Sequence, residues 1–548
     1  MKVVIQNKVF EIKNPTEVID LIDDKERKYI LCRINGRIKD LHYKITKDST
    51  IELLDLTQKE STVAYESSLR YLITLVIKKL YPNSRVVFNY SVSRSIFCNV
   101  SDLGHQFNKK NLNEINNELQ ELIKKDIPFV YDKISVSEAK EYFSKIGYYE
   151  KYNLLNYFKD DAKVPVYKCD DFMNYLLTLM VPSTGYLDKY VLNLYTPGFT
   201  ISYPRYECGG QIPEFKDEKN FRTALIAANK WLDITKSDTI TKIHDIVNKG
   251  QALDFINLCE VRHSQQLTHL GDQIEENAYR IKMICIAGPS SSGKTTFANR
   301  LKIELRSRGL LPVTISMDDF YKTDDYPLTE AGKPDYESIE ALDLKLFDET
   351  ISKLIKGKSV KFPKFDFTTK SRSFVGPVKL DKNQVLIIEG IHGLNDKIAP
   401  SVYDDSKFKI FISPLGQYRI DGHTPISISD LRLIRRLVRD YYFRSASAET
   451  TFNMWSDVRN GEFKWIYPNQ NNADFVFNSE LSYELCVLKE YAIPILEKVP
   501  KTSPNYLTAK RLSVFLSYYP TITSKWIPSN SIIREFIGES IFYTSDKN

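Results

Sequence analysis

The sequence predicts a multidomain protein of mixed α+β and α/β class. Its 548 residues exceed the size of one ordinary domain. The first sixty residues carry short runs of alternating apolar and polar residues, which favour a small β-rich unit. From Lys282 onward, apolar strand candidates alternate with helical patterns, and this order favours a parallel sheet with helices on both faces. We therefore expect five segments, with the bounds 1–60, 61–222, 223–279, 280–503 and 504–548.

Hairpins and one short helix are expected within the first segment. VVIQNKVFEI alternates around Asn7-Lys8, and YILCRINGRIKD turns at Asn35-Gly36, a dipeptide favoured in two-residue hairpin turns. Between them, TEVIDLIDD predicts a short helix that Thr16 opens, and STIELLDL adds a further strand.

The pattern then changes along the chain. Residues 63–160 are predicted to be largely helical, because SSLRYLITLVIKKLY and LNEINNELQELIKK repeat apolar residues at helical spacing. Residues 165–222 predict strands and loops, and the polar pattern of 223–278 predicts a helical connector. A helix, YLTAKRLSVFLSYY, and a tail are expected at the end. The strand candidates of the fourth segment are Met283–Ala287, Pro312–Ser316, Val385–Glu389, Phe408–Ile412 and Ala473–Asn478.

Composition argues against several classes of protein. The net charge of +6 and the pI of about 8.6 suit phosphate-bearing partners but are weak evidence for nucleic-acid binding. No apolar run approaches the roughly 18 residues of a membrane helix, and the start lacks the apolar core of a signal peptide. The seven cysteines include no CxxC pair, which indicates reduced thiols in a cytoplasmic protein. The spacing of His263 and His269 puts them on different helix faces, so no metal site is predicted there.

A phosphate-binding loop is predicted at residues 288–295, which fit G-x-x-x-x-G-K-[ST] without a mismatch. A strand candidate precedes the motif and a helical pattern follows it, which disfavours an ordinary Gly/Ser loop. Lys294 should reach the β and γ phosphates of ATP, and the Thr295 hydroxyl should ligate Mg²⁺. The expected ATP-binding residues are Gly288, Pro289, Ser290, Ser291, Ser292, Gly293, Lys294, Thr295 and Thr296.

Carboxylates follow two of the neighbouring strand candidates. Asp318 lies where Pro312–Ser316 ends, at the sheet edge where ligands of open α/β sheets bind. A kinase needs such a carboxylate to orient the acceptor hydroxyl and take its proton. The alternative is that Asp318 and Asp319 only cap a helix. Glu389 ends another strand candidate and is a candidate to hold magnesium, or else caps the following turn.

Four arginines of DLRLIRRLVRD share one predicted helical face. They are Arg432, Arg435, Arg436 and Arg439. Guanidinium groups so arranged repel one another unless anions lie between them, and Arg binds phosphate in bidentate fashion. Such a helix can close over ATP, and Arg439 joins Lys294 and Asp318 as the predicted catalytic set. The alternative is a solvated basic face, or one paired with Asp430 and Asp440.

With these residues in hand, the stretch from about 280 to 500 resembles the uridine kinase and phosphoribulokinase family of P-loop kinases. The matching pieces are GPSSSGKT, SMDDFY, YESIEALD, PKFDFTTKSR, VLIIEGIHGL and RLIRRLVRD. The resemblance implies that Asp318 activates the acceptor and that Tyr321 and Glu337 lie near its ribose side. It implies that Glu389 is the magnesium-associated acid. Arg436 and Arg439 would then meet the acceptor and the phosphates.

The segment that reads the base departs from that family. Uridine kinases typically present Tyr and His there, where this sequence has Phe365 and Lys370. Phe365 can still stack on a base, whereas Lys370 adds a charge that would suit an acidic acceptor. His392 lies close to the predicted site, either as a substrate contact or as a turn residue.

The N-terminal half is similar to the front of a threonyl-tRNA synthetase. Residues 1–60 resemble its TGS β-grasp domain, through INGRIKDL, and residues 61–222 resemble its second additional, editing domain. The His-x-x-x-His pair of that domain would fall at Ser67 and Tyr71, so we expect neither editing hydrolysis nor zinc.

The leading hypothesis is therefore an ATP-dependent and Mg²⁺-dependent kinase that phosphorylates the 5′-hydroxyl of a uridine-like or cytidine-like nucleoside. Two alternatives stay open: a kinase of another metabolite, such as a sugar phosphate or modified nucleoside, and an RNA-associated protein with an ATP switch. The expected partners are a small-molecule acceptor, RNA contacted through the N-terminal domains and a second copy of the chain, but no membrane.

Overall fold

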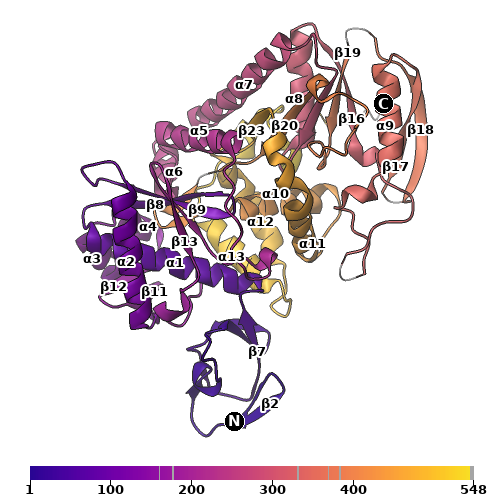
Figure 1. The fold of residues 1–548 in the computed structure, drawn as a ribbon. Helices are drawn as coiled ribbons and strands as arrows, with labels where there is room; N and C mark the ends of the chain where they lie inside the picture. Colours follow the sequence, from indigo (N-terminus) through magenta and orange to yellow (C-terminus); the bar gives the residue numbers. More distant parts are fainter. Residues whose placement is uncertain are drawn as a thin grey trace. The chain divides into compact units, whose positions relative to one another are not determined.

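The computed structural model describes residues 1–159, 161–175, 178–329, 332–367, 369–381, 384–416 and 418–542 (Figure 1). The chain forms two compact units. Unit 1 comprises Met1–Asp217, Asp238–Thr241 and Gln417–Ile426. Unit 2 comprises Glu218–Ser237, Lys242–Gly416 and Ser427–Asn548. None of the helices in the described ranges combines the length and apolar character that crossing a bilayer requires.

Unit 1 begins with a five-stranded sheet of order β2-β1-β7-β4-β5. Its strands are β1 Lys2–Ile5, β2 Lys8–Glu11, β4 Tyr29–Ile34, β5 Arg37–Asp40 and β7 Ser49–Asp55. Asn35 (φ 48°) and Gly36 (φ 81°) form the predicted turn between β4 and β5. The first turn falls on Gln6 and Asn7, one residue earlier than predicted, because Ile5 pairs with Lys8.

The helix predicted to open at Thr16 does not form. Thr16–Glu17 is strand β3, paired with β6 (Lys44–Ile45), and only Ile19–Leu21 is helical, as one 3₁₀ turn. The physical reason is that Val18 and Ile19 donate their backbone N–H groups to Tyr43 and Leu41. These cross-chain bonds replace those an α-helix would make.

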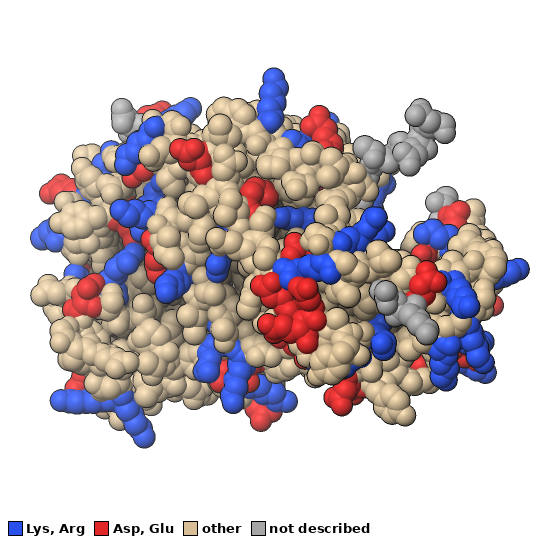
Figure 2. Space-filling model, turned by 90° about the horizontal axis from the view of Figure 1, so that it is seen from above, with Lys and Arg blue, Asp and Glu red and all other residues tan. Residues whose placement is uncertain are grey.

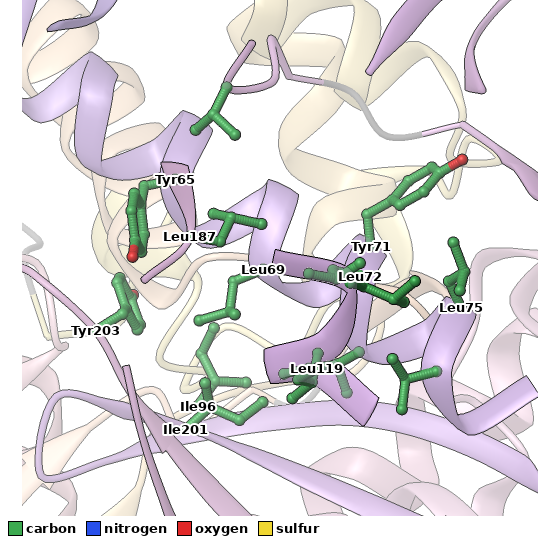
Figure 3. Close-up of a cluster of buried hydrophobic side chains, with 14 of the residues drawn as sticks. Tyr65, Leu69, Tyr71, Leu72, Leu75, Ile96, Leu119, Leu187, Ile201 and Tyr203 are labelled. Atoms are coloured by element: carbon green, nitrogen blue, oxygen red, sulfur yellow. The ribbon is translucent and has the colours of Figure 1, made fainter. Parts of the chain in front are cut away.

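The second part of unit 1 packs helix α1 (Lys59–Leu80) against a four-stranded sheet of order β13-β14-β9-β8. Figure 3 shows the core between them, where Leu69 and Leu72 lie near Ile96 and Ile201. The other elements are β8 Arg85–Val92, β9 Ser95–Ser101, α2 Lys109–Lys125, β10 Val130–Ser135, α3 Val136–Lys145, α4 Tyr149–Leu154, β11 Lys163–Cys169, β12 Phe172–Asn174, β13 Val191–Tyr195 and β14 Gly198–Ser202.

The predicted helices α1 and α2 are confirmed, but the largely helical pattern expected over 63–160 missed three strands. Strand β9 is almost wholly buried, so its short apolar run carries no period-2 alternation to separate it from helix. All seven cysteines lie in the described residues and are free thiols, as expected.

A hairpin from far along the chain completes unit 1. Strands β21 (Arg419–Asp421) and β22 (Thr424–Pro425) belong to this unit, although unit 2 resumes at Ser427. The Lys151 Nζ lies 3.0 Å from the Asp421 carboxylate, with both side chains buried. Arg419 forms a second buried ion pair, 2.5 Å from Asp238. The hairpin is thus held within unit 1 by charges that are costly to separate.

Unit 2 contains the predicted parallel sheet, with order β16-β19-β15-β20-β23. All five predicted strands are confirmed, as β15 Met283–Ala287, β16 Leu311–Ser316, β19 Gln384–Glu389, β20 Lys407–Ser413 and β23 Phe475–Asn478. Every residue of β15 is buried, so both faces of the sheet are covered at its centre.

Unit 2 also contains helices and one hairpin, and the first two residues of α6 belong to unit 1. The helices are α5 Lys219–Thr235, α6 Ile240–Asn248, α7 Ala252–Glu276, α8 Lys294–Ser307, α9 Leu344–Ile355, α10 Ile428–Phe443, α11 Ala448–Gly461, α12 Glu484–Glu497, α13 Tyr506–Ser517 and α14 Arg534–Ile537. The hairpin pairs β17 (Val360–Asp366) with β18 (Ser371–Val378). Short helical turns lie at Met317–Phe320 and Glu462–Ile466. The predicted helical character of the connector and of the penultimate helix, α13, is confirmed.

Breaking the buried pair of unit 1 should be costly. We expect Lys151→Met to lower the free energy of unfolding of unit 1 by about 3–5 kcal/mol, because it leaves the Asp421 carboxylate buried without its cation. Denaturant unfolding of the full chain measures this. The matched control is Lys168→Met, whose ion pair with Asp132 is exposed and should contribute less than about 1 kcal/mol. Equal losses in the two variants would contradict the prediction.

Candidate active site

The predicted phosphate loop joins the end of β15 to the start of α8, in the expected strand–loop–helix order. Gly288 passes so close to the Ile412 carbonyl that a side chain there would collide with backbone. Gly293 has φ +88°, a conformation that L side chains rarely adopt. The backbone path thus requires both glycines of the motif.

Lys294 lies within this loop rather than in open solvent. Its Nζ donates to the carbonyl oxygens of Gly288 (2.9 Å) and Pro289 (3.1 Å). Burial lowers the pKa of Lys294, and the nearby carboxylates of Glu389 and Asp318 oppose that shift. The ammonium group is therefore placed between the loop and two acids.

Two buried hydroxyls of the loop are suited to binding a phosphate group. Ser291 and Ser292 are almost fully buried, and their Oγ atoms have no hydrogen-bond partner within the described residues. Unpartnered buried hydroxyls are costly, and phosphate oxygens would accept from them. Thr295 is exposed at the first turn of α8, and Thr296 is buried beside it. The loop therefore fits the phosphates of a nucleotide.

Asp318, Ser316 and Glu389 meet at the carboxyl edge of the sheet. The Ser316 hydroxyl donates to Glu389 Oε1 at 3.0 Å and accepts from the Asp318 backbone N–H at 3.4 Å. Strands β16 and β19 pair Ser316 directly with Glu389, which accounts for the arrangement. Ser316 links the two predicted acids, and the sequence motifs did not indicate this role.

The acids of this edge have raised pKa values. Desolvation by the surrounding protein raises the pKa of Asp318, and the nearby Lys294 opposes that shift, although the side chain is partly open to solvent. Burial is the main cause that raises the pKa of Glu389 and Glu337 to about 7 in each case. Neighbouring carboxylates, Asp318 for Glu389 and Glu462 for Glu337, raise them further.

Aromatic rings gather beside these acids at the β17–β18 hairpin. Tyr321 lies 5.9 Å from Phe365 and 5.4 Å from Phe367, measured between ring centroids. The Tyr321 hydroxyl donates to the Tyr336 carbonyl oxygen at 2.8 Å. Lys370 is exposed, with its Nζ 6.0 Å from the Tyr336 ring centroid. The structure therefore brings the predicted Tyr321, Phe365 and Lys370 to one place.

The four arginines lie on helix α10, as expected, and protein carboxylates hold them. Arg432 pairs with Glu462, and Arg435 pairs with Glu484, all four side chains being buried. Arg436 and Arg439 both pair with Asp440. The alternative of pairing with Asp440 is thus confirmed. Asp430 instead pairs with Arg511.

Helix α10 is also bonded to the phosphate loop. Arg432 Nε donates to the Ser290 carbonyl oxygen at 2.9 Å, and Arg436 donates to the Ser290 hydroxyl at 2.8 Å. Arg435 donates more weakly to the Ser291 carbonyl oxygen at 3.4 Å. The arginine face therefore lies against the loop.

The rings of His392 and Trp465 lie edge to face in the same unit. His392 is 2% exposed, and neither ring nitrogen has a hydrogen-bond partner in the described part of the chain. Burial lowers the pKa of His392 to about 4, so its imidazole is neutral. Among the same residues Trp465 Nε1 also lacks a partner, and the two ring centroids lie 6.4 Å apart.

In unit 1, the residues at the synthetase-like histidine positions are packed in the core. Ser67 and Tyr71 lie on α1, with 0% and 1% exposure. The Tyr71 hydroxyl contacts the carbonyl oxygens of Tyr167 (3.0 Å) and Phe172 (2.7 Å). Their side chains therefore contribute to packing.

Different parts of the chain are similar to different known proteins. Residues 283–483 match the Phosphoribulokinase / Uridine kinase family. A uridine kinase of Staphylococcus aureus is 30% identical over 197 residues, 35% of this chain and 86% of that protein. A threonine–tRNA ligase of Desulforamulus reducens matches the N-terminal region at 29% identity over 161 residues, 29% of this chain. This chain spans only 25% of that ligase. A solved Bacillus stearothermophilus structure, described as a possible uridine kinase, is 20% identical with a TM-score of 0.26, covering 40% of this chain and 99% of that one.

The raised pKa of Glu337 predicts how stability depends on pH. A carboxyl whose folded pKa rises from 4.5 to about 7 contributes stability below pH 4.5 that is lost as the pH rises through 7. We expect Glu337→Gln to remove this loss. At about pH 8 the variant should be more stable by about 1–2 kcal/mol, a figure discounted for solvent at this half-buried group, with no gain near pH 5.

Thermal unfolding of the full chain across this pH range is the measurement. Glu340→Gln is the matched control, because Glu340 is an exposed carboxylate of the same segment. A stability difference between Glu337→Gln and the unmodified protein that does not change with pH would contradict the prediction.

Proposed function

The chain belongs to the phosphoribulokinase / uridine kinase family, and on this premise we propose that it is an ATP-dependent kinase of a small-molecule alcohol. One observation carries the proposal: Lys294, in a loop whose buried hydroxyls lack partners among the described residues, lies beside the carboxylates Asp318 and Glu389. The acceptor we favour is a nucleoside, phosphorylated on its 5′-hydroxyl to give the monophosphate and ADP.

The residues of the loop have separate tasks in this proposal. The backbone N–H groups before α8, with Ser291 and Ser292, bind the phosphates of ATP. Lys294 exchanges its carbonyl partners for the β and γ phosphate oxygens. Thr295 and Glu389 are the residues that would hold Mg²⁺, which supplies charge neutralisation at the phosphates when bound.

Asp318 acts on the acceptor. Its carboxylate accepts a hydrogen bond from the acceptor hydroxyl and takes the proton as the oxygen attacks the γ phosphorus. The bond to the ADP oxygen breaks as the new phosphate ester forms. Arg436 and Arg439 share the buried Asp440, so one of the two guanidinium groups can turn to phosphate oxygens while the other still neutralises that carboxylate.

The ring cluster favours a flat acceptor. Tyr321, Phe365 and Phe367 provide apolar faces on which a base can stack, and Glu337 is a candidate partner for ribose hydroxyls. The exposed Lys370 favours the second candidate, an acidic acceptor such as a sugar phosphate, because its ammonium group lies 6.0 Å from the Tyr336 ring, which in turn contacts Tyr321.

The N-terminal part has the features of two domains. We propose that residues 1–60 form a TGS-like β-grasp domain and that residues 61–222 form a domain like the synthetase's second additional domain. The five-stranded sheet and the match to a threonine–tRNA ligase support this assignment. On the face shown in Figure 2, basic and acidic side chains of the described residues are interspersed rather than gathered in one basic stripe. Because the net charge of +6 over 548 residues is also only mildly basic, RNA binding is the weaker proposal for the chain.

Replacement of the acceptor-facing acid should separate binding from turnover. We expect Asp318→Asn to lower kcat by roughly 10²–10⁴-fold while ATP still binds, because only proton transfer is lost. Steady-state ADP release and ATP binding measure the two effects. Asp319→Asn is the matched control, since its carboxylate contacts Lys364 instead. Normal turnover in Asp318→Asn would show that another group acts as the base.

An acceptor screen tests the substrate class. We expect purified protein with ATP and Mg²⁺ to release ADP faster with uridine or cytidine than with sugars or sugar phosphates. Turnover only with an anionic acceptor, lost in Lys370→Ala, would replace the nucleoside by an acidic substrate. No turnover with any alcohol, together with salt-dependent RNA binding, would favour the RNA-associated alternative.

A further inference from the structure

A segment near the C-terminus lies on the phosphate loop. We name residues 531–539, which include α14, the C-terminal strap. Glu535 Oε2 accepts a hydrogen bond from the Thr296 backbone N–H at 3.1 Å. Thr296 is in the first turn of α8, where the N–H groups have no partner within their own helix. A protein carboxylate thus lies where the loop is built to bind an anion.

Apolar contacts hold the strap in this place. Ile532 is fully buried against Gly293, so that a Cβ at that glycine would lie 2.6 Å from Ile532 Cγ2. Phe536, also fully buried, lies under the Arg435 guanidinium at 5.1 Å. The Ser531 hydroxyl donates to Glu260 at 2.5 Å. The strap is therefore a packed element and not a loose tail.

The strap also touches the C-terminal end of α10. A Cβ on Gly538 would lie 2.8 Å from Phe443 Cζ, so the glycine allows close approach to the last residue of that helix. Glu535 is near enough to Arg444 for its charge to oppose the lowering of the Arg444 pKa by burial. The strap thus contacts both the loop and the arginine helix.

The charge of Glu535 opposes the binding of phosphate. It lies near Lys294 and Glu389, as Asp318 does, so it adds a third carboxylate to a place that must accept a triphosphate. A helix N-terminus stabilises one anion at a time on a given N–H group, and two anions there repel each other. ATP and Glu535 therefore compete for the Thr296 N–H.

We propose that the C-terminal strap is an autoinhibitory element in which Glu535 occupies part of the phosphate site and is displaced by the nucleotide. This inference rests on the proposed binding of ATP at this loop. The strap then sets the affinity for ATP, and its release frees the C-terminal end of α10, which bears Arg439, from the Gly538 contact.

The test compares ATP binding by the full chain and by Glu535→Gln. Glutamine keeps the shape and the hydrogen-bond acceptor but removes the charge. We expect the Kd for ATP–Mg²⁺, measured by calorimetry, to fall by about three- to tenfold. The matched control is Glu539→Gln, which removes an exposed carboxylate of the same strap that pairs with Arg534, and should leave the Kd unchanged. Melting temperatures verify that both variants are folded.

The outcomes separate the two proposals. An unchanged or weaker ATP affinity in Glu535→Gln, with binding abolished in Lys294→Ala, would overturn the strap and leave the kinase proposal standing. Absence of ATP binding to both the unmodified chain and Glu535→Gln would overturn both.

Hydrogen exchange gives a second measurement on the unmodified chain. We expect backbone amides of residues 531–539 to exchange faster when ATP–Mg²⁺ is bound, because the strap leaves the loop. Slower exchange there would mean that the strap closes on the nucleotide, which would overturn the autoinhibitory role.

Discussion

The N–H groups at the start of α8, which have no partner within their own helix, are the constraint on which unit 2 depends. A helix of this length leaves its first turn without internal partners, and its dipole concentrates positive charge there. The surrounding residues respond to that charge. Lys294 folds back on the carbonyls of its own loop, the Ser291 and Ser292 hydroxyls have no partner within the described residues, and Glu535 supplies a carboxylate. Together these features fit a loop that exchanges one anion for another.

A related electrostatic constraint applies to helix α10, because the four arginines on one of its faces repel one another unless anions lie between them. The protein supplies them as Glu462, Glu484 and Asp440, so α10 is held in place before any ligand arrives. The carboxylates of all these pairs are buried, so leaving any one of them without a cation would strand a charge. Arg432 and Arg435 each have a carboxylate of their own, whereas Arg436 and Arg439 share Asp440, so one of these two can turn to phosphate while the other stays paired.

Much of the kinase-like unit could be predicted from the sequence, because its signals are local. A glycine-rich loop between an apolar strand and a helix is a specific mark of phosphate binding, and each buried parallel strand is one short apolar run. The partners of the site were not local. Glu535 lies more than two hundred residues after Thr296, and Ser316 meets Glu389 only because β16 and β19 are neighbours. Strands β8, β9 and β10 were missed because their sequences do not alternate clearly between apolar and polar residues. Strand β9 is almost wholly buried, and the exposure of β10 is irregular.

The hairpin of unit 1 extends the argument about α10. Its strands belong to unit 1 through buried pairs of Lys151 with Asp421 and Arg419 with Asp238, and helix α10 starts directly after it, capped by Ser427. The first turn of α10 is therefore joined by a short stretch of chain to a segment that is costly to dislodge. Its far end carries Arg439 and meets the strap at Gly538. The two ends of α10 are thus fixed in different ways, the first by the chain that leads to the hairpin and the second by contact with the strap.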